Sequence, residues 1–128
     1  MKVIIAGSRT VTNYECIKQA VKDSKFKITE IVSGHAEGAD KLGEKYAKEN
    51  NIKLKLFEAD WKNIDKPGAI VKENGYGKYN AKAGIERNED MGKYADALIA
   101  IIHNESKGTE HMINFMERLG KKTYVKVV

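Results

Sequence analysis

Three short glycine-centred loops hold most of the residues that could bind a phosphate. They cover residues 6–9, 33–40 and 106–109, and each one follows an apolar run and precedes a helix-like pattern. In an open α/β sheet, the N–H groups at a helix N-terminus face the crevice beyond the strand ends and bind phosphate there. Three such loops at one edge of a sheet indicate a binding site for a phosphate-bearing ligand.

The first loop combines a glycine with two side chains that suit a phosphate. Gly7 lets the chain turn sharply and lets a ligand approach the backbone, while Ser8 and Arg9 offer a hydroxyl and a guanidinium. The arginines of the chain are Arg9, Arg87 and Arg118, and the first two lie beside predicted site loops. Because a planar guanidinium matches the geometry of a phosphate, we expect Arg9 and Arg87 to contact the ligand.

The second loop places a carboxylate in the first turn of a predicted helix. Gly34 and Gly38 bracket a tight turn. The Asp40 carboxylate either caps N–H groups of that helix or accepts a hydrogen bond from a ribose hydroxyl. His35 has no second metal-binding residue at a useful spacing, so we interpret it as a loop residue near the ligand and expect no metal.

The third loop combines small donors with the start of a helix. Thr109 is a good N-cap residue, and Ser106 and Gly108 precede it, so the segment is either a phosphate cradle or a simple helix cap. Glu110 and His111 follow. A carboxylate and an imidazole near a crevice could perform acid–base chemistry, although such side chains on a helix face are more often solvated.

The elements that carry these loops alternate between apolar runs and helical periodicity, as in a parallel α/β sheet. We expect strands at 2–6, 28–32, 53–57, 97–102 and 123–127, and helices at 12–24, 39–50, 81–94 and 109–119. The first and fourth strands are apolar on both faces, like central strands, whereas the third and fifth alternate with lysine, like edge strands. The sequence therefore predicts one three-layer Rossmann-like α/β domain over residues 1–128, with a mostly parallel five-stranded sheet in the order 3-2-1-4-5.

The connection between the third strand and the third helix is unusually long. It contains the only tryptophan, Trp61, the only proline, Pro67, and three glycines. Connections of this length in a compact domain are usually functional or mobile. We expect a helical turn at residues 60–64 and a flexible flap at residues 62–80, which serves either as a ligand lid or as a plain surface insertion.

Composition sets limits on the function. The formal charge is +5 and the isoelectric point about 9.2, but the excess comes from scattered lysines, so we do not expect nucleic acid as a partner. Cys16 is the single cysteine, which excludes an internal disulfide and favours a reducing, cytoplasmic environment. No apolar stretch approaches the length of a membrane span, so we expect no membrane partner.

Several well-defined catalytic and nucleotide-binding motifs are missing from the sequence. The first strand is not followed by G-x-G-x-x-G, and the chain contains no Walker A loop, no G-x-S-x-G elbow and no zinc-type spacing. The three loops must therefore bind a phosphate in some other arrangement.

Taken together, these motifs resemble the YspA-like branch of the SLOG superfamily, a Rossmann-like group that includes the DNA-processing protein DprA and the Lonely Guy hydrolases. The resemblance covers residues 2–127, with anchors at 6–9, 32–40, 59–61, 83–91, 95–100 and 106–109. It implies a domain that binds a nucleotide or nucleotide-derived ligand and requires no cofactor. The implied ligand-binding residues are Gly7, Ser8, Arg9, Ser33, Gly34, His35, Gly38, Asp40, Arg87, Asn88, Ser106, Gly108 and Thr109.

The chain departs from the family pattern in two informative places. His35 occupies the position of the second glycine in the usual Ser-Gly-Gly loop. After Gly108 and Thr109, Glu110 stands out of register with the glutamate that the Lonely Guy hydrolases use. The resemblance alone therefore favours ligand binding over hydrolysis.

Three functions are compatible with this resemblance. The first is sensing or sequestration of a nucleotide-derived molecule, such as a signalling nucleotide in a prokaryote or phage. The second is an N-glycosidase or phosphoribohydrolase acting on a nucleoside monophosphate, with Arg87, Glu110 and Asp40 as candidate catalytic residues. The third is binding of single-stranded DNA, for which aromatic residues are poorly interleaved with the basic ones. The superfamily is also compatible with a homodimer.

Overall fold

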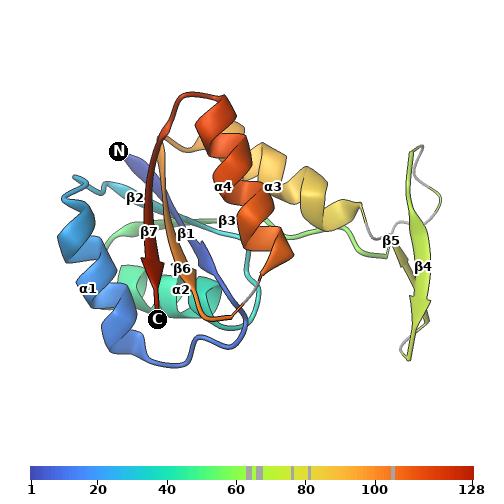
Figure 1. Cartoon of the computed structure of the whole chain (residues 1–128), viewed down its shortest axis with the longest axis horizontal. Coiled ribbons are helices and arrows are strands. Elements are labelled where there is room, and N and C mark those ends of the chain that lie inside the picture. Colours follow the sequence, from blue (N-terminus) through green and yellow to red (C-terminus); the bar gives the residue numbers. More distant parts are fainter. Residues whose placement is uncertain (63–64, 66–67, 76, 81, 105) are drawn as a thin grey trace.

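A five-stranded parallel sheet forms the centre of the protein (Figure 1). The computed structural model describes residues 1–62, 65, 68–75, 77–80, 82–104 and 106–128. The predicted order is confirmed, because predicted strands four and five are β6 and β7, and all neighbouring strands of this sheet run parallel. From one edge to the other, the strands are β3 (Lys53–Leu56), β2 (Glu30–Ser33), β1 (Lys2–Gly7), β6 (Ala97–Ile102) and β7 (Lys122–Val127).

Within the described residues, four helices cover the two faces of this sheet and complete the predicted three layers. Helices α1 (Tyr14–Ser24) and α2 (Ala39–Glu49) lie on one face, and α3 (Ala83–Tyr94) and α4 (Lys107–Arg118) lie on the other (Figure 1). Each face has its own apolar core, because successive side chains of a strand point to opposite faces. Ile5 of β1 packs toward α1 and α2, whereas Ile4 packs toward α3 and α4.

The burial of the strands agrees with their predicted places in the sheet. Ile4 and Ile5 of β1 and Leu98 and Ile99 of β6 are completely inaccessible to solvent. A strand covered on both faces needs apolar residues at consecutive positions, which is the pattern that both segments have. The edge strands β3 and β7 remain partly exposed and carry lysines, which discourage pairing with other chains.

Helix α2 begins at the predicted residue, whereas α1 begins later and α4 earlier than the periodicity predicted, and the caps of α1 and α4 explain the differences. Helix α1 begins at Tyr14 because the Asn13 side chain accepts a hydrogen bond from the N–H of Glu15 at 3.1 Å. The expected start of α4 at Thr109 is wrong. Helix α4 begins at Lys107, and Ser106 is its N-cap.

The long connection contains a hairpin that the sequence analysis did not predict. Strands β4 (Val71–Asn74) and β5 (Gly77–Asn80) pair in an antiparallel ladder, which projects from the body of the protein (Figure 1). The expected flap at 62–80 and helical turn at 60–64 include residues 63, 64, 66, 67 and 76, which lie outside the described residues. Within the described part of the chain, no helix has the length and apolar character of a membrane span.

A single lysine fixes the C-terminal end of α3, the helix that carries Arg87. The Lys121 ammonium group donates hydrogen bonds to the carbonyl oxygens of Gly92 and Ala95, both at 2.7 Å, and of Lys93 at 3.2 Å. The last carbonyls of a helix lack intrahelical donors, and the negative end of the helix dipole favours a cation. Lys121 therefore links α3 to the start of β7.

We predict that Lys121→Met lowers the free energy of unfolding by about 1–3 kcal/mol, because three carbonyl groups lose a charged donor. Urea unfolding followed by circular dichroism measures this change. Lys122→Met is the matched control, because the neighbouring Lys122 side chain is exposed. Equal stability of the two variants would show that Lys121 does not hold α3.

Candidate functional site

A cleft of about 530 Å³ lies beyond the carboxyl ends of β1 and β6, where the strand order of the sheet reverses direction. Its walls come from the loops after β1, β2 and β6 and from the facing sides of α3 and α4. The expected ligand-binding residues that line it are Gly7, Ser8, Arg9, Asp40, Arg87, Asn88, Ser106, Gly108 and Thr109. The topology thus brings the three loops together at one edge of the sheet.

The loops after β1 and β2 touch through their backbones. A Cβ atom on Gly38 would lie 2.4 Å from the carbonyl oxygen of Ser8, and Gly38 has a φ of +82°. A Cβ atom on Gly7 would lie 2.0 Å from the carbonyl oxygen of Ile101. Larger residues cannot occupy either position without moving the backbone, so these two glycines set the spacing of the loops.

Ser8 joins the loop after β1 to the loop after β6. Its N–H donates to the carbonyl oxygen of Ile101 at 3.0 Å, and its hydroxyl accepts a hydrogen bond from the N–H of His103, also at 3.0 Å. Ser8 is buried, whereas Arg9 is exposed. Arg9 is therefore the side chain of the first loop that is best placed to meet a ligand from solvent.

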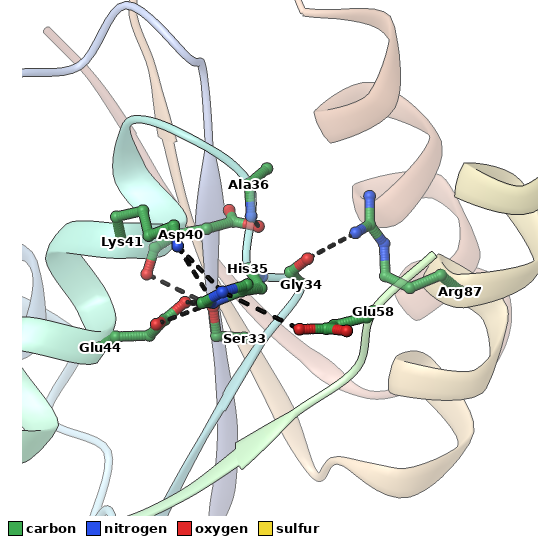
Figure 2. Close-up of polar contacts among 9 residues, drawn as sticks. All are labelled: Ser33, Gly34, His35, Ala36, Asp40, Lys41, Glu44, Glu58 and Arg87. Atoms are coloured by element: carbon green, nitrogen blue, oxygen red, sulfur yellow. Dashed lines mark hydrogen bonds and ion pairs between the residues drawn. The ribbon is translucent and has the colours of Figure 1, made fainter. Parts of the chain in front are cut away.

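A hydrogen-bonded network lies beneath the loop after β2 (Figure 2). The Ser33 hydroxyl donates to the Glu44 carboxylate at 2.8 Å, and Nδ1 of His35 lies 3.0 Å from both oxygens of that carboxylate. Lys41 Nζ lies 3.0 Å from Nε2 of His35. Since an ammonium only donates, Nε2 accepts from Lys41 and Nδ1–H donates to Glu44.

This network holds His35 in a backbone conformation that usually favours glycine. His35 has a φ of +61°, in the left-handed region that favours glycine. Charged partners hold its ring on both sides, and the backbone N–H of His35 donates a hydrogen bond to the Ser33 hydroxyl at 3.1 Å. Ser33 is completely buried and is not a cleft-lining residue. Its hydroxyl therefore supports the loop rather than facing a ligand.

Asp40 is the buried carboxylate of the site. It accepts a hydrogen bond from the N–H of Ala36 at 3.3 Å, and a Cβ atom on Gly34 would lie 2.9 Å from its Oδ2 atom. Burial raises the pKa of Asp40 to about 6, against the opposing effects of the Ala36 N–H and the Arg87 charge. Asp40 therefore changes its charge close to neutral pH.

Arg87 and Asn88 of α3 form a chain of hydrogen bonds across the cleft. Arg87 Nη1 donates to the carbonyl oxygen of Gly34 at 2.6 Å, as Figure 2 shows, and its Nε donates to Asn88 Oδ1 at 3.1 Å. Asn88 Nδ2 in turn donates to the carbonyl oxygen of Gly108 at 3.1 Å. Burial lowers the pKa of Arg87, although an arginine remains charged at physiological pH.

The first turn of α4 forms the third wall. Ser106 accepts a hydrogen bond from the N–H of Thr109 at 3.4 Å, and the two hydroxyl groups are 2.8 Å apart. A Cβ atom on Gly108 would meet no atom within 4 Å, so the backbone there is open to the cleft. The first N–H groups of a helix have no intrahelical acceptor and carry a partial positive charge.

The two residues after Thr109 separate in the structure. Glu110 is exposed and is not among the residues that line the cleft, so the structure does not bring this catalytic candidate to Asp40 and Arg87. His111 does line the cleft, and its ring stacks on Phe115 with centroids 6.2 Å apart. Among the described residues, no group of three or more metal-binding side chains is arranged around a common point.

Other cleft residues were not among the predicted ligand-binding set. They include Trp61, whose ring contacts Gly84, and His103 and Asn104, which follow β6 directly. The rule that ligands bind beyond the carboxyl ends of strands at a switch point would have identified the pair after β6. Trp61 lies outside this rule, because it enters from the long connection after β3.

A second cleft of about 370 Å³ adjoins the first. Arg9, Ala36, Trp61 and Arg87 line both clefts and form the boundary between them. The other residues of the second cleft are Gly34, His35, Glu37, Glu58 and Ala59. Gly38 does not line either cleft, in agreement with its role in packing the two loops together.

Comparison with known proteins supports the resemblance drawn from the motifs. A family model described as the YspA, cpYpsA-related SLOG family matches residues 1–63. The solved structure of DNA processing protein A (DprA) from Streptococcus pneumoniae has a similar fold, with a TM-score of 0.50 and 16% sequence identity. The match covers 98% of this chain and 58% of the DprA chain. No curated protein matches the chain significantly in sequence. Residues 1–63 are thus similar to the YspA-related SLOG family, and the chain shares the Rossmann-like fold of DprA.

Proposed function

We propose that this protein binds a nucleotide or a nucleotide-derived small molecule in the cleft beyond β1, β2 and β6, as a sensor or a sequestering protein. One observation carries this proposal: Arg9, Arg87 and the first turn of α4 line the same cleft of about 530 Å³. Two guanidinium groups and a helix N-terminus together favour a ligand with at least one phosphate.

The phosphate position is best defined near Gly108. The backbone there is open, and Ser106 and Lys107 also line the cleft. An anion at this point would accept hydrogen bonds from the N–H groups of the first turn and gain from the helix dipole. Arg9 would approach the same anion from the opposite loop.

The wall between α3 and α4 suits the remainder of a nucleotide. Met91 and Met112 are buried beside the cleft, and Ile85 and the ring of Trp61 lie at its exposed side. Ligand sites commonly combine such an apolar wall with a few polar groups that fix the orientation. A nucleobase has the flat, partly apolar surface that this wall would accept.

Hydrolysis of a nucleoside monophosphate is the second candidate function, and Asp40 is the observation in its favour. A carboxyl group with a pKa of about 6 can exchange a proton near neutral pH, and it lies beside Arg87 in the cleft. Glu110, the other acidic candidate, is exposed outside the cleft. The geometry therefore supports binding better than a two-carboxylate mechanism.

Native mass spectrometry of the purified protein, followed by denaturation and analysis of released small molecules, tests the proposal first. Incubation with the common nucleoside monophosphates then separates the alternatives. A binding protein leaves them intact, whereas a hydrolase releases free base. Affinity only for single-stranded DNA, falling steeply with salt concentration, would contradict a small-molecule function.

We predict that Arg9→Ala weakens nucleoside monophosphate binding by about 10- to 100-fold, because a charge-assisted hydrogen bond to phosphate contributes about 1.5–3 kcal/mol. Isothermal titration calorimetry measures this loss. Arg118→Ala is the matched control, since Arg118 lies at the far end of α4 over the Phe115 ring and does not line the clefts. Equal losses in both variants would exclude a specific role for Arg9.

We predict that Asp40→Asn changes how stability depends on pH. The folded-state pKa of about 6 lies above the value of about 3.9 in an unfolded chain, so protonation of Asp40 favours the folded state. This contribution is complete below about pH 4 and is lost as the pH rises through about 6. Relative to wild type, Asp40→Asn should gain about 3 kcal/mol of stability between pH 4 and pH 8.

Urea unfolding at a series of pH values measures this effect. Asp23→Asn, at an exposed position on α1, is the matched control for the removal of one carboxyl group. Parallel profiles for wild type and Asp40→Asn would show that the carboxyl group titrates normally in the folded protein.

A further inference from the structure

The two adjoining clefts share one wall but differ in chemistry. Their volumes, about 530 and 370 Å³, both fall in the range of small-molecule sites. Arg9, Arg87 and Trp61 stand at their boundary, because each of these residues lines both clefts. A ligand that reaches the boundary from the first cleft therefore enters the second without leaving the protein surface.

The second cleft is rich in hydrogen-bond acceptors. Glu37 and Glu58 are exposed residues of its lining. Ionised carboxylates only accept hydrogen bonds, so they bind hydroxyl groups and repel phosphate. The Gly34 carbonyl oxygen, which already accepts from Arg87, adds a further acceptor beside them. Beyond the shared arginines, the first cleft adds Lys107 and the start of α4 and favours anions, whereas the second adds Glu37 and Glu58 and favours a group with several hydroxyls.

The carboxylates near His35 differ in their freedom to meet a ligand. The Glu44 side chain is 6% exposed and is held by Ser33 and His35. The Glu58 side chain is 72% exposed, and its Oε1 atom lies 3.9 Å from Nε2 of His35. Figure 2 shows Glu58 and Arg87 on the same side of the loop that contains Gly34. Glu58 can therefore turn toward a ligand held by Arg87, whereas Glu44 cannot.

We propose that the second cleft binds a sugar attached to the terminal phosphate of a nucleotide, with Arg9 and Arg87 holding this sugar-bearing phosphate at the boundary between the clefts. The ligand class is a nucleoside diphosphate sugar. This inference rests on the proposed function, because the nucleotide part occupies the first cleft. Glu37 and Glu58 bind the sugar hydroxyls and determine specificity for the larger ligand.

Calorimetric titrations with matched ligand pairs test this assignment: ADP against ADP-ribose or ADP-glucose, UDP against UDP-glucose, and GDP against GDP-mannose. In at least one pair the sugar derivative should bind ten times more tightly than its diphosphate. Glu58→Ala and Glu37→Ala should each reduce that advantage about fivefold and leave diphosphate affinity unchanged or increased. Glu117→Ala, at an exposed position of α4, is the matched control and should retain the advantage.

These titrations distinguish failure of the sugar site from failure of nucleotide binding in the first cleft. If the diphosphates bind and no sugar derivative binds more tightly, the second cleft is not a sugar site and the proposed function stands. The inference also fails if the advantage survives in both glutamate variants. If no nucleotide of any kind binds, the proposed function fails and the sugar site fails with it.

Discussion

The contact between the loops after β1 and β2 is the constraint on which the site depends. Gly38 lies so close to Ser8 and Arg9 that a single added carbon would overlap the backbone. This contact fixes the N-terminus of α2 against the end of β1, and Gly7 fixes β1 against β6 in the same way. Without these close backbone contacts of Gly38 and Gly7, the cleft would lose the geometry that brings Asp40, Arg9 and the start of α4 together.

Two buried carboxylates, one at each end of the parallel strands, have opposite pKa shifts. At the amino end of β2, Glu30 accepts hydrogen bonds from the Tyr94 hydroxyl and the Lys53 ammonium group, and the Tyr94 bond lowers the pKa of Glu30. At the carboxyl edge, burial outweighs the partners of Asp40 and raises its pKa. The first carboxylate is satisfied by its neighbours. The negative charge of the second carboxylate is only partly stabilised by its partners in the cleft, and such perturbed groups are common at functional sites.

The sheet was predictable from the sequence because its signals are local. Consecutive apolar residues identified β1 and β6 as central strands, and lysine alternation identified β3 and β7 as edges. The residues of the three loops were also predictable, but their individual roles were not. Ser33 and Gly38 belong to the same motif as Gly34, yet they support the loop from below while Gly34 lines the second cleft. The roles depend on contacts with Glu44 and Ser8, which no local pattern encodes.

The hairpin of β4 and β5 is a place where the chain tolerates a change in length. It leaves the body of the protein between Trp61 and the start of α3, and its return is fixed by the N–H of Asn80, which donates to the carbonyl oxygen of Trp61 at 2.6 Å. Because the entropy of closing a loop grows only slowly with its length, segments grafted between such fixed ends cost the fold little. Insertions or deletions in this excursion can therefore be accommodated while the sheet stays intact.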